Sequence, residues 1–418
     1  MSDITLSSEE KRIRLIRVIG LCVLAFTLML SYALARPAVE SIFLQQHSYK
    51  SLPIVWLFVA AGALFTTLLY NQFASRIELV RLFALITTTS ALLLLGLIFA
   101  TKAQLPGSTY ALYIWKDLYI VVLVETFWSF SNAVFPLNTA KWVYGTFCMM
   151  GSLGGIAGNL LVGRLARSIG TNNVLWVLFP LLLLIGAGCF LFAKFAGYKG
   201  DAHYDKEPPN VTEGFQIVRK SRYLLLMLLV IVATQIAITL IDYQFNQVIQ
   251  QAYPQKDLRT DVIGKVYTAI AIVALVLESS TGLILRFLGV SATFLLLPAL
   301  LGFAVGGAML VPLFLTMAIA KVTSKSLDYS VFRASKELLY LPLGYKEKTQ
   351  GKAVVDIMTY RVAKGLASLL VLTFTTMGWA YLVPYFTPLM IGVWFVLAWL
   401  IIQRYTTLIQ AEANEVGD

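Results

Sequence analysis

KFAGYKGDAHYDKEPPNVTEGFQIVRKSR, residues 194–222, is a long polar interval in a chain of 418 residues that is otherwise mostly apolar. The chain is 58% hydrophobic and 13% charged, with a mean hydropathy of +0.77, whereas soluble proteins usually carry about 25% charged residues. A bilayer is therefore the solvent for most of this chain. We interpret the polar interval as a linker between two membrane-embedded halves.

Six apolar stretches on each side of this interval have the length, about 20 residues, that crosses roughly 30 Å of hydrocarbon. The predicted spans are 15–36, 53–71, 80–100, 110–134, 141–163, 174–194, 223–247, 263–284, 288–307, 309–331, 352–375 and 383–404. The sequence thus predicts an all-α membrane protein with twelve transmembrane helices, divided into an N-terminal half (1–194), a cytoplasmic linker (195–222) and a C-terminal half (223–418). This arrangement resembles the major facilitator superfamily, whose halves rock around a central site.

The orientation is predicted from the distribution of Lys and Arg. Lys11 and three arginines precede a first apolar run that ends in ALARPA, which imitates a signal peptide; we interpret it as an uncleaved first span. With the N-terminus inside, most Lys and Arg fall in or beside cytoplasmic segments, and few fall in outer loops. The positive-inside rule therefore predicts that both termini are cytoplasmic, in the inner membrane of a bacterium.

The cysteines, histidines and sequence motifs of the chain give no sign of an enzyme or of a cofactor. Cys22, Cys148 and Cys189 lie in apolar runs without metal-ligand spacing, and His47 and His203 are the chain's two histidines. No phosphate-loop, nucleophile-elbow or HExxH motif is present, so we expect neither an ATPase nor a hydrolase, and no metal. The net charge of +11 suits an anionic leaflet and gives no reason to expect a nucleic-acid partner.

Two segments carry a resemblance to a known family. SVFRASKELLYLPLGYKEKTQGKAVVDIMTYRVAKG, residues 330–365, resembles the signature of the nucleotide transporter family, the ATP/ADP translocases of plastids and intracellular bacteria. ETFWSFSNAVFPLNTAKWVYGTFCMMGSLGGIAGN, residues 125–159, looks like a second family segment. The resemblance implies a secondary transporter of a small anionic metabolite, in particular a nucleotide, acting by ATP/ADP exchange.

The resemblance also implies roles for individual residues. Lys364 matches the lysine of the family's R-x-GK, with Ala363 in place of the glycine. Val39 and Asn246 stand where the family tends to have cations. ATP carries roughly four negative charges, and phosphate recognition usually relies on several Lys or Arg side chains. The absence of a cation at these two positions therefore affects the expected substrate, ATP or ADP, more than the expected fold.

The eleventh predicted span carries three ionisable groups. Asp356, Arg361 and Lys364, with Tyr360, fall within about 140° of arc on a helix. A bare charge at the bilayer centre costs about 3 to more than 10 kcal/mol, so such residues normally face the bundle interior. They are candidates for a cavity that binds an anion, with Asp356 as an ion-pair partner; the alternative is a structural ion network that joins helices.

Other spans contain further candidate polar groups. Glu125 and Asn132 lie on one stripe of the fourth span, and Glu278 lies in the eighth. We expect either substrate contacts, proton carriage, or structural ion pairs for these residues. We expect Lys116 and Asp117 to be interfacial.

The first and seventh predicted spans carry a third group of candidate polar residues. Arg36 precedes Pro37, which should break or bend the first helix, and Glu40 follows one turn later. Arg36 is a candidate for binding substrate, and Glu40 and Asp242 are candidates for coupling or ion pairing. The glycine-rich run GSLGGIAGNLLVG, residues 151–163, is interpreted as a face that lets two helices approach closely.

Three functional classes remain open from the sequence. The first is a nucleotide exchanger, and the second is a proton-coupled transporter of another metabolite or a drug, with the proton on Glu125, Glu278 or Asp242. The third is a non-transporting membrane protein that kept the fold; the end of the chain at NEVGD, soon after the last predicted span, gives this class no support. We expect a monomer embedded in lipid.

Overall fold

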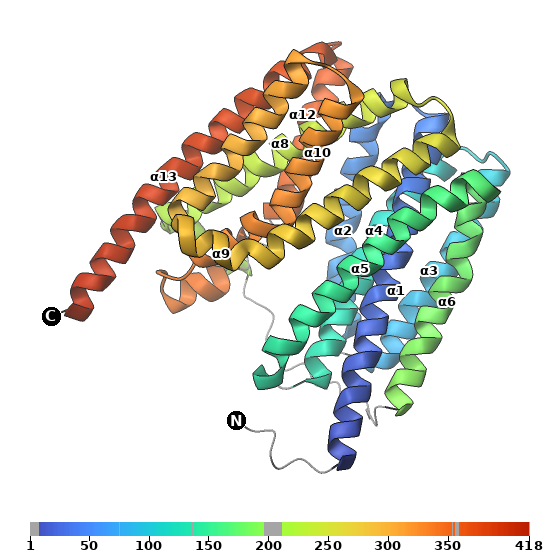
Figure 1. Cartoon of the computed structure of the whole chain (residues 1–418), viewed down its shortest axis with the longest axis horizontal. Coiled ribbons are helices and arrows are strands. Elements are labelled where there is room, and N and C mark those ends of the chain that lie inside the picture. The colour runs from blue at the N-terminus through green and yellow to red at the C-terminus, as the bar shows by residue number, and fades with distance from the viewer. Residues whose placement is uncertain are drawn as a thin grey trace. The chain divides into compact units, whose positions relative to one another are not determined.

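The computed structural model describes residues 8–74, 76–135, 137–195, 211–352, 354–355 and 359–417, and within these ranges the chain contains no β-strand (Figure 1). The helices are α1 (Ser8–Gln46), α2 (Leu52–Ala74), α3 (Leu79–Lys102), α4 (Ser108–Val134), α5 (Leu137–Ile169), α6 (Thr171–Phe195), α7 (Val211–Lys220), α8 (Arg222–Ala252), α9 (Lys256–Leu310), α10 (Phe314–Leu327), α11 (Arg333–Leu339), α12 (Thr359–Thr376) and α13 (Val383–Gly417). Short 3-10 turns lie at Tyr49–Ser51 and Ala380–Leu382, and π-helical turns lie at Asp328–Phe332 and Glu347–Gly351.

The helices coincide with the predicted spans. Eight helices of the described chain are long and apolar enough to cross a membrane. One of them, α9, has 55 residues and covers two predicted spans, which meet at Gly289, where φ is 74° and ψ is 167°. Only glycine adopts this conformation readily, so Gly289 marks the connector between the two spans. The all-α membrane fold is confirmed.

Two local features add detail to the sequence analysis. Of the break or bend expected at Pro37, the break does not occur and the first helix continues to Gln46, because a proline within a long membrane helix removes one hydrogen bond that its surroundings can compensate. The C-terminal part of the predicted linker forms α7. A Cβ placed on Gly214 of α7 would lie 2.7 Å from the carbonyl oxygen of Gln350, so α7 packs closely on the chain near residue 350.

The helices form two compact units. Unit 1 comprises residues 1–47, 61–205 and 253–271, and unit 2 comprises residues 48–60, 206–252 and 272–418. Short segments thus pack with the opposite half: 48–60 with unit 2, and 253–271 with unit 1. Units defined by packing do not test where the two predicted halves of the sequence begin and end. The halves 1–194 and 223–418 therefore stay a prediction.

Unit 1 is organised around the close approach of α1 and α5, which lie side by side (Figure 1). A Cβ on Gly154 would lie 2.8 Å from the carbonyl carbon of Phe26, and one on Gly158 would lie 2.7 Å from the carbonyl oxygen of Leu30. Real Cβ contacts are not this short. The expectation that residues 151–163 provide a small-residue face is therefore confirmed.

Unit 2 is organised around α8, which packs against α10, α12 and α13. Seventeen of its residues are buried, as expected of a helix surrounded by other helices. This arrangement places Asp242 of α8 against α10 and Gln244 of α8 against Thr387 of α13.

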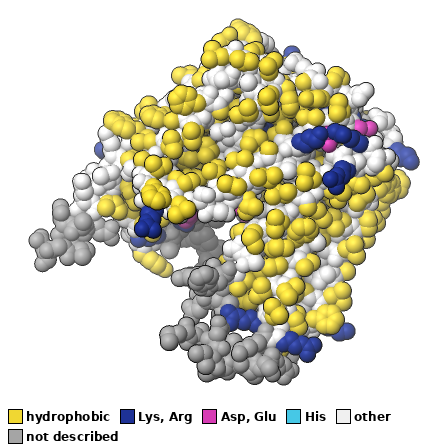
Figure 2. All heavy atoms as spheres, viewed as in Figure 1, with side chains coloured by type: hydrophobic (Ala, Val, Ile, Leu, Met, Phe, Trp, Pro, Cys, Tyr) yellow, Lys and Arg dark blue, Asp and Glu magenta, His cyan; other side chains and the backbone are white. Residues whose placement is uncertain are grey.

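The outer surface of the helices is apolar. Figure 2 shows hydrophobic side chains over most of the visible described surface, with Lys and Arg in a few patches. Large exposed side chains include Phe287, Phe303 and Leu310, each at least 80% exposed. Monomeric soluble proteins rarely expose such surface, whereas lipid-facing helices require it.

Candidate functional site

An ion cluster inside unit 1 joins the first helix to the fourth. The Nε atom of Arg36 lies 3.2 Å from Glu40 Oε1, and Lys116 Nζ lies 3.9 Å from the same oxygen and 2.9 Å from Asp117 Oδ1. The hydroxyl of Tyr267 donates to both carboxylate oxygens of Glu40, at 3.2 and 3.0 Å. Two cations and two carboxylates thus neutralise one another within unit 1.

Aromatic rings complete this cluster. The guanidinium carbon of Arg36 lies 3.9 Å from the centroid of the Tyr267 ring, and Lys116 Nζ lies 3.7 Å from that of Tyr113. Lys116 is only 1% exposed. The expectation that Lys116 is interfacial was therefore wrong, since carboxylates and a ring face replace the water around its ammonium group.

A second ion cluster lies inside unit 2, between α8 and α10. Asp242 Oδ1 lies 3.1 Å from Lys321 Nζ, and Asp242 Oδ2 lies 2.9 Å from Lys325 Nζ. Lys321 Nζ also lies 4.3 Å from the centroid of the Phe245 ring. The sequence singled out Asp242 but not the two lysines, whose side chains are 2% and 12% exposed.

The predicted cations of α12 also belong to unit 2. Arg361 and Lys364 are both half-buried, and both interact with other groups of the chain. The backbone carbonyl of Lys364 accepts a hydrogen bond from Ser368 at 2.8 Å. Asp356 lies outside the described residues. Unit 2 thus presents basic side chains from two helices, α10 and α12, that both pack on α8.

The remaining predicted site residues are not brought into either cluster. Glu125 and Asn132 are exposed on α4, and Asn132 accepts a hydrogen bond from the hydroxyl of Tyr144. Glu278 is exposed on α9. Among the described residues, neither Glu125 nor Glu278 forms an ion pair. The hydroxyl of Ser279, the residue after Glu278, donates to the carbonyl of Leu275 at 2.8 Å.

The two positions that lack an expected cation are buried. Val39 is 0% exposed, and Asn246 is 5% exposed and donates from Nδ2 to the backbone carbonyl of Asp242 at 2.7 Å. Asn246 lies directly after Phe245, whose ring contacts Lys321. A cation of α10, Lys321, therefore lies against the residue next to Asn246, the position where the family tends to have a cation.

A buried arginine fastens the start of α9 to α1. Arg259 is 1% exposed, and its guanidinium donates to the carbonyl of Ser41 at 2.8 Å and to Gln45 Oε1 at 3.1 Å. Close to it along α9, Asp257 accepts from Thr171 Oγ1 at 2.6 Å, and Asp261 pairs with Arg167. These contacts hold the N-terminal turns of α9 within unit 1.

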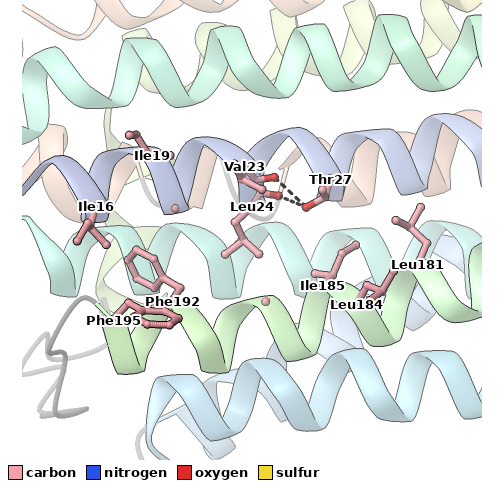
Figure 3. A pocket seen from close by; sticks show the side chains of 12 residues that line it. Ile16, Ile19, Val23, Leu24, Thr27, Leu181, Leu184, Ile185, Phe192 and Phe195 are labelled. Atoms are coloured by element: carbon pink, nitrogen blue, oxygen red, sulfur yellow. Dashed lines mark hydrogen bonds between the residues drawn. The ribbon is translucent and has the colours of Figure 1, made fainter.

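An apolar cavity of 460 Å³ lies between α1 and α6 (Figure 3). Leu24, Leu184 and Phe192 are among its lining residues, and its one hydroxyl, on Thr27, donates to the carbonyls of Val23 and Leu24 at 2.9 and 3.1 Å. No charged group lines it. This cavity is unsuited to an anion, and the charged clusters are the better candidate sites.

A family model confirms the relationship that the sequence segments indicate. The model described as "TLC ATP/ADP transporter" matches residues 197–315 and 302–407, a region that includes α8, α10 and α12. The chain belongs to the TLC ATP/ADP transporter family. Its matched region holds Asp242, both lysines of α10 and both basic residues of α12.

Relatives within the TLC family are distant in sequence. "ADP,ATP carrier protein 5" of Rickettsia conorii is 23% identical over 305 residues, which cover 61% of this chain and 59% of the relative. "ADP,ATP carrier protein 1" of Chlamydia pneumoniae is 25% identical over 304 residues, covering 62% and 59%. The alignments thus span about three-fifths of the length of these curated relatives.

Solved structures share the fold of this TLC family chain. The nucleoside transporter NupG superimposes with a TM-score of 0.62 at 12% identity, covering 94% of this chain and 98% of that one. A bacterial homologue of the iron transporter ferroportin, in its inward-facing state, gives 0.68 at 12% identity, covering 95% and 100%. At such identity the likeness shows the fold alone, which is the major facilitator type.

Three cluster residues escaped the sequence analysis: Lys116, Lys321 and Lys325. The signal for the α10 pair was present, because two lysines four residues apart lie inside an apolar stretch predicted to span the membrane at 309–331. Residues at i and i+4 share one helix face. Two cations on one face of a span indicate an internal partner, and Asp242 supplies it.

Proposed function

We propose that this chain is a secondary transporter that exchanges nucleotides, of the ATP/ADP type, by alternating access. The observation that carries the proposal is that the region matching the TLC family contains both basic helices of unit 2. The relatives bear the name ADP,ATP carrier protein. A polyphosphate needs several Lys or Arg donors, and α10 and α12 supply four.

The proposed roles follow the contacts. Lys364 and Arg361 receive an anionic group of the substrate, with Asp356 as an ion-pair partner of the empty state. Arg36 is proposed as a further substrate-binding residue, considered within unit 1 alone, where Glu40 and Tyr267 contact its guanidinium. Glu125, Asn132 and Glu278 are proposed as substrate contacts from exposed positions of α4 and α9.

The proposed location is the inner membrane of a bacterium, with both termini cytoplasmic and a monomer as the functional form. The Lys and Arg asymmetry supports this orientation.

Counterflow in liposomes tests the proposed exchange. Purified protein is reconstituted with internal ADP, internal phosphate or buffer alone, and uptake of labelled ATP is measured with and without a proton gradient. We expect uptake that requires internal ADP and does not require the gradient. Uptake that proceeds without an internal nucleotide and follows the gradient would contradict exchange.

The second candidate is a proton-coupled transporter of another metabolite. Glu125 and Glu278 favour it, because each is an exposed carboxyl on an apolar helix and forms no ion pair among the described residues. Asp242 is a weaker candidate for the proton, since two lysines stabilise its charged form. The counterflow experiment separates this candidate from the first.

A further inference from the structure

The short helix α7 has one face packed on unit 2 and the opposite face exposed. Gly214 and Val218 are buried, and a Cβ on Gly214 would lie 2.7 Å from the carbonyl oxygen of Gln350. The exposed side chains fall within about 140° of arc on the other side of the helix. They are those of Phe215, Gln216, Arg219 and Lys220. The exposed face of α7 therefore carries two cations and an aromatic ring.

The cations at the end of α7 have no carboxylate partner in the part of the chain that the structure describes. Arg219, Lys220 and Arg222, the first residue of α8, are all exposed and form no ion pair there. The carboxylate of α7 itself, that of Glu213, lies 3.5 Å from Lys346. Three positive charges thus lie close together along the chain without a countercharge from the described residues.

The depth of these cations in the membrane follows from α8. Helix α7 ends at Lys220 and α8 begins at Arg222, so that Ser221 alone separates a surface helix from a helix able to cross the membrane. Arg222 is exposed on the same stripe of α8 as Leu225 and Leu229, which are 44% and 40% exposed. Residues at i, i+3 and i+7 share one helix face, and exposed leucines of a membrane helix face lipid. A basic residue at the end of such a stripe lies at the level of the lipid headgroups.

Anionic lipid headgroups match the chemistry of this surface. Arginine binds phosphate oxygens through two parallel N–H groups, and lysine adds a point charge. Each basic residue next to an anionic membrane strengthens binding about fivefold. Phenylalanine beside basic residues is typical of helices that lie at the boundary between headgroups and acyl chains. Phe215 is 53% exposed and lies one helical turn before Arg219.

We propose that Arg219, Lys220 and Arg222 bind the phosphate headgroups of anionic membrane lipids, and that Phe215 enters the adjoining acyl region. Helix α7 then lies against the leaflet at which α8 begins, which is the cytoplasmic leaflet in the proposed orientation. The proposal does not depend on which solute the chain transports, because none of these residues is assigned to substrate.

The buried face of α7 connects this lipid-binding surface to the segment that resembles the family signature, residues 330–365. Gly351 ends the π-helical turn Glu347–Gly351. A Cβ on Gly351 would lie 2.7 Å from Leu224 Cδ1 and 3.3 Å from Ile217 Cγ2, so the turn packs against both α7 and α8. Lipid bound to α7 therefore restrains the turn that precedes α12, and it stabilises unit 2.

Two measurements on the full chain test the lipid-binding surface. In the first, the melting temperature of protein in a neutral detergent is recorded during titration with a short-chain phosphoglycerol lipid, a short-chain phosphocholine lipid or soluble glycerol phosphate, at constant ionic strength. In the second, Phe215→Cys in a background without Cys22, Cys148 and Cys189 carries a fluorophore. This protein is reconstituted in phosphocholine vesicles with or without phosphoglycerol lipid, and quenching by lipids brominated in their acyl chains reports the depth of position 215.

We expect the phosphoglycerol lipid to raise the melting temperature more than the phosphocholine lipid does, and glycerol phosphate to leave it unchanged. Arg219→Gln, Lys220→Gln and Arg222→Gln should each weaken binding of the phosphoglycerol lipid about fivefold. Arg81→Gln is the matched control and should bind as wild type does, because Arg81 is 72% exposed but is already paired with Glu78 at 2.9 Å. The fluorophore at position 215 should be quenched by the brominated lipids, and more strongly in vesicles that contain phosphoglycerol lipid.

Variants that keep the charge separate lipid binding from a structural role. Arg219→Lys and Arg222→Lys should respond to the phosphoglycerol lipid nearly as wild type does. If the Gln variants melted earlier in neutral detergent but responded to this lipid as wild type does, the cations would be structural and the proposal would be wrong.

Three further results would overturn the proposal. One is equal stabilisation by the phosphoglycerol and phosphocholine lipids, which would remove the requirement for a negative charge. Another is stabilisation by glycerol phosphate alone, which would assign the surface to a soluble phosphate. The third is a fluorophore at position 215 that brominated lipids do not quench, which would place α7 away from the bilayer.

Discussion

Lysine and arginine have different roles in the two ion clusters. Arg36 is held at both ends, by Glu40 at 3.2 Å and by the Tyr267 ring at 3.9 Å, so its planar guanidinium has one geometry. Lys321 and Lys325 both pair with the carboxylate of Asp242, and a lysine ammonium is a point charge without the fixed fork geometry of a guanidinium.

The same distinction predicts different phenotypes for Lys364 and Arg361 on α12. We expect Lys364→Gln to weaken nucleotide binding about tenfold or more, because it removes a charge that meets the substrate directly. We expect Arg361→Gln to act at least partly by lowering stability, because a guanidinium suits a fixed bidentate partner. Nucleotide affinity and the melting temperature of purified variants are the measurements.

Lys346→Gln is the control for loss of one positive charge from unit 2, because Lys346 pairs with Glu213 at 3.5 Å but its side chain is 76% exposed. If Lys364→Gln bound nucleotide as well as wild type while melting earlier, Lys364 would be a structural clamp, and its assignment to an anion site would be wrong.

Glu125 and Glu278 distinguish exchange from proton coupling. The amide of glutamine keeps the shape of glutamate but cannot titrate. If either residue carries the coupled proton, its change to Gln should abolish gradient-driven uptake and spare exchange. Obligatory exchange instead predicts that both variants respond to the proton gradient as wild type does. Uptake measured at several imposed proton gradients distinguishes the two outcomes.

Individual residues show how far the sequence could lead. It singled out Asp242 as a candidate for coupling, proton carriage or ion pairing, because a charge in an apolar span is rarely without a function or a partner, and the structure pairs it with Lys321 and Lys325. It misplaced Lys116, because distance from a helix end does not show whether a neighbouring helix brings a carboxylate, as α1 does with Glu40. Contacts between helices distant in sequence are set by packing, which periodicity does not encode.

Elements were predicted better than their ends and connections. Apolar length located the helices, because the bilayer fixes how many residues a span needs. It did not foresee that α1 continues through Pro37 to Gln46, or that the two parts of α9 join at Gly289 with almost no loop. Termination depends on capping and tertiary contacts, so composition alone locates it poorly.

The α1–α5 contact provides a stability prediction with a matched control. Gly154→Ala would place a Cβ 2.8 Å from the carbonyl carbon of Phe26, whereas a Cβ at the adjacent Gly155 has no atom within 4 Å. We expect Gly154→Ala to lose about 1–3 kcal/mol of stability through overpacking. We expect Gly155→Ala to be neutral or to gain up to about 1 kcal/mol from its better helix propensity.

Thermal or denaturant unfolding of the purified proteins in one detergent compares the two variants directly. Equal stability of both would show that α1 can move away from α5 without loss, and the small-residue face would not be a structural requirement.

At the scale of the whole molecule, the two compact units differ in composition as well as in packing. Unit 1 contains an ion cluster of two cations and two carboxylates. Arg259 connects the start of α9 to α1 by a hydrogen bond to the carbonyl of Ser41. Unit 2 contains the cluster of Asp242, Lys321 and Lys325 and the basic residues of α12, so these basic side chains of the TLC-matched region lie within one compact unit.

The orientation of the whole chain is the last prediction, and it follows from the Lys and Arg asymmetry. Residues 195–221 and 335–351 should face the cytoplasm, because cytoplasmic segments carry the excess of positive charge. Single cysteines at positions 200 and 344, in a background without Cys22, Cys148 and Cys189, should resist a membrane-impermeant maleimide in intact cells. Both should react once the membrane is permeabilised.

A cysteine in place of Ala103 is the positive control. Ala103 is exposed in the short connection between α3 and α4, which the same topology places outside, so it should react in intact cells. If positions 200 and 344 both reacted from outside while position 103 was protected, the orientation of the whole chain would be the reverse of the predicted one. Reaction at only one of the first two would mean that an odd number of spans separates them, and one of the predicted helices between 223 and 331 would not cross the membrane.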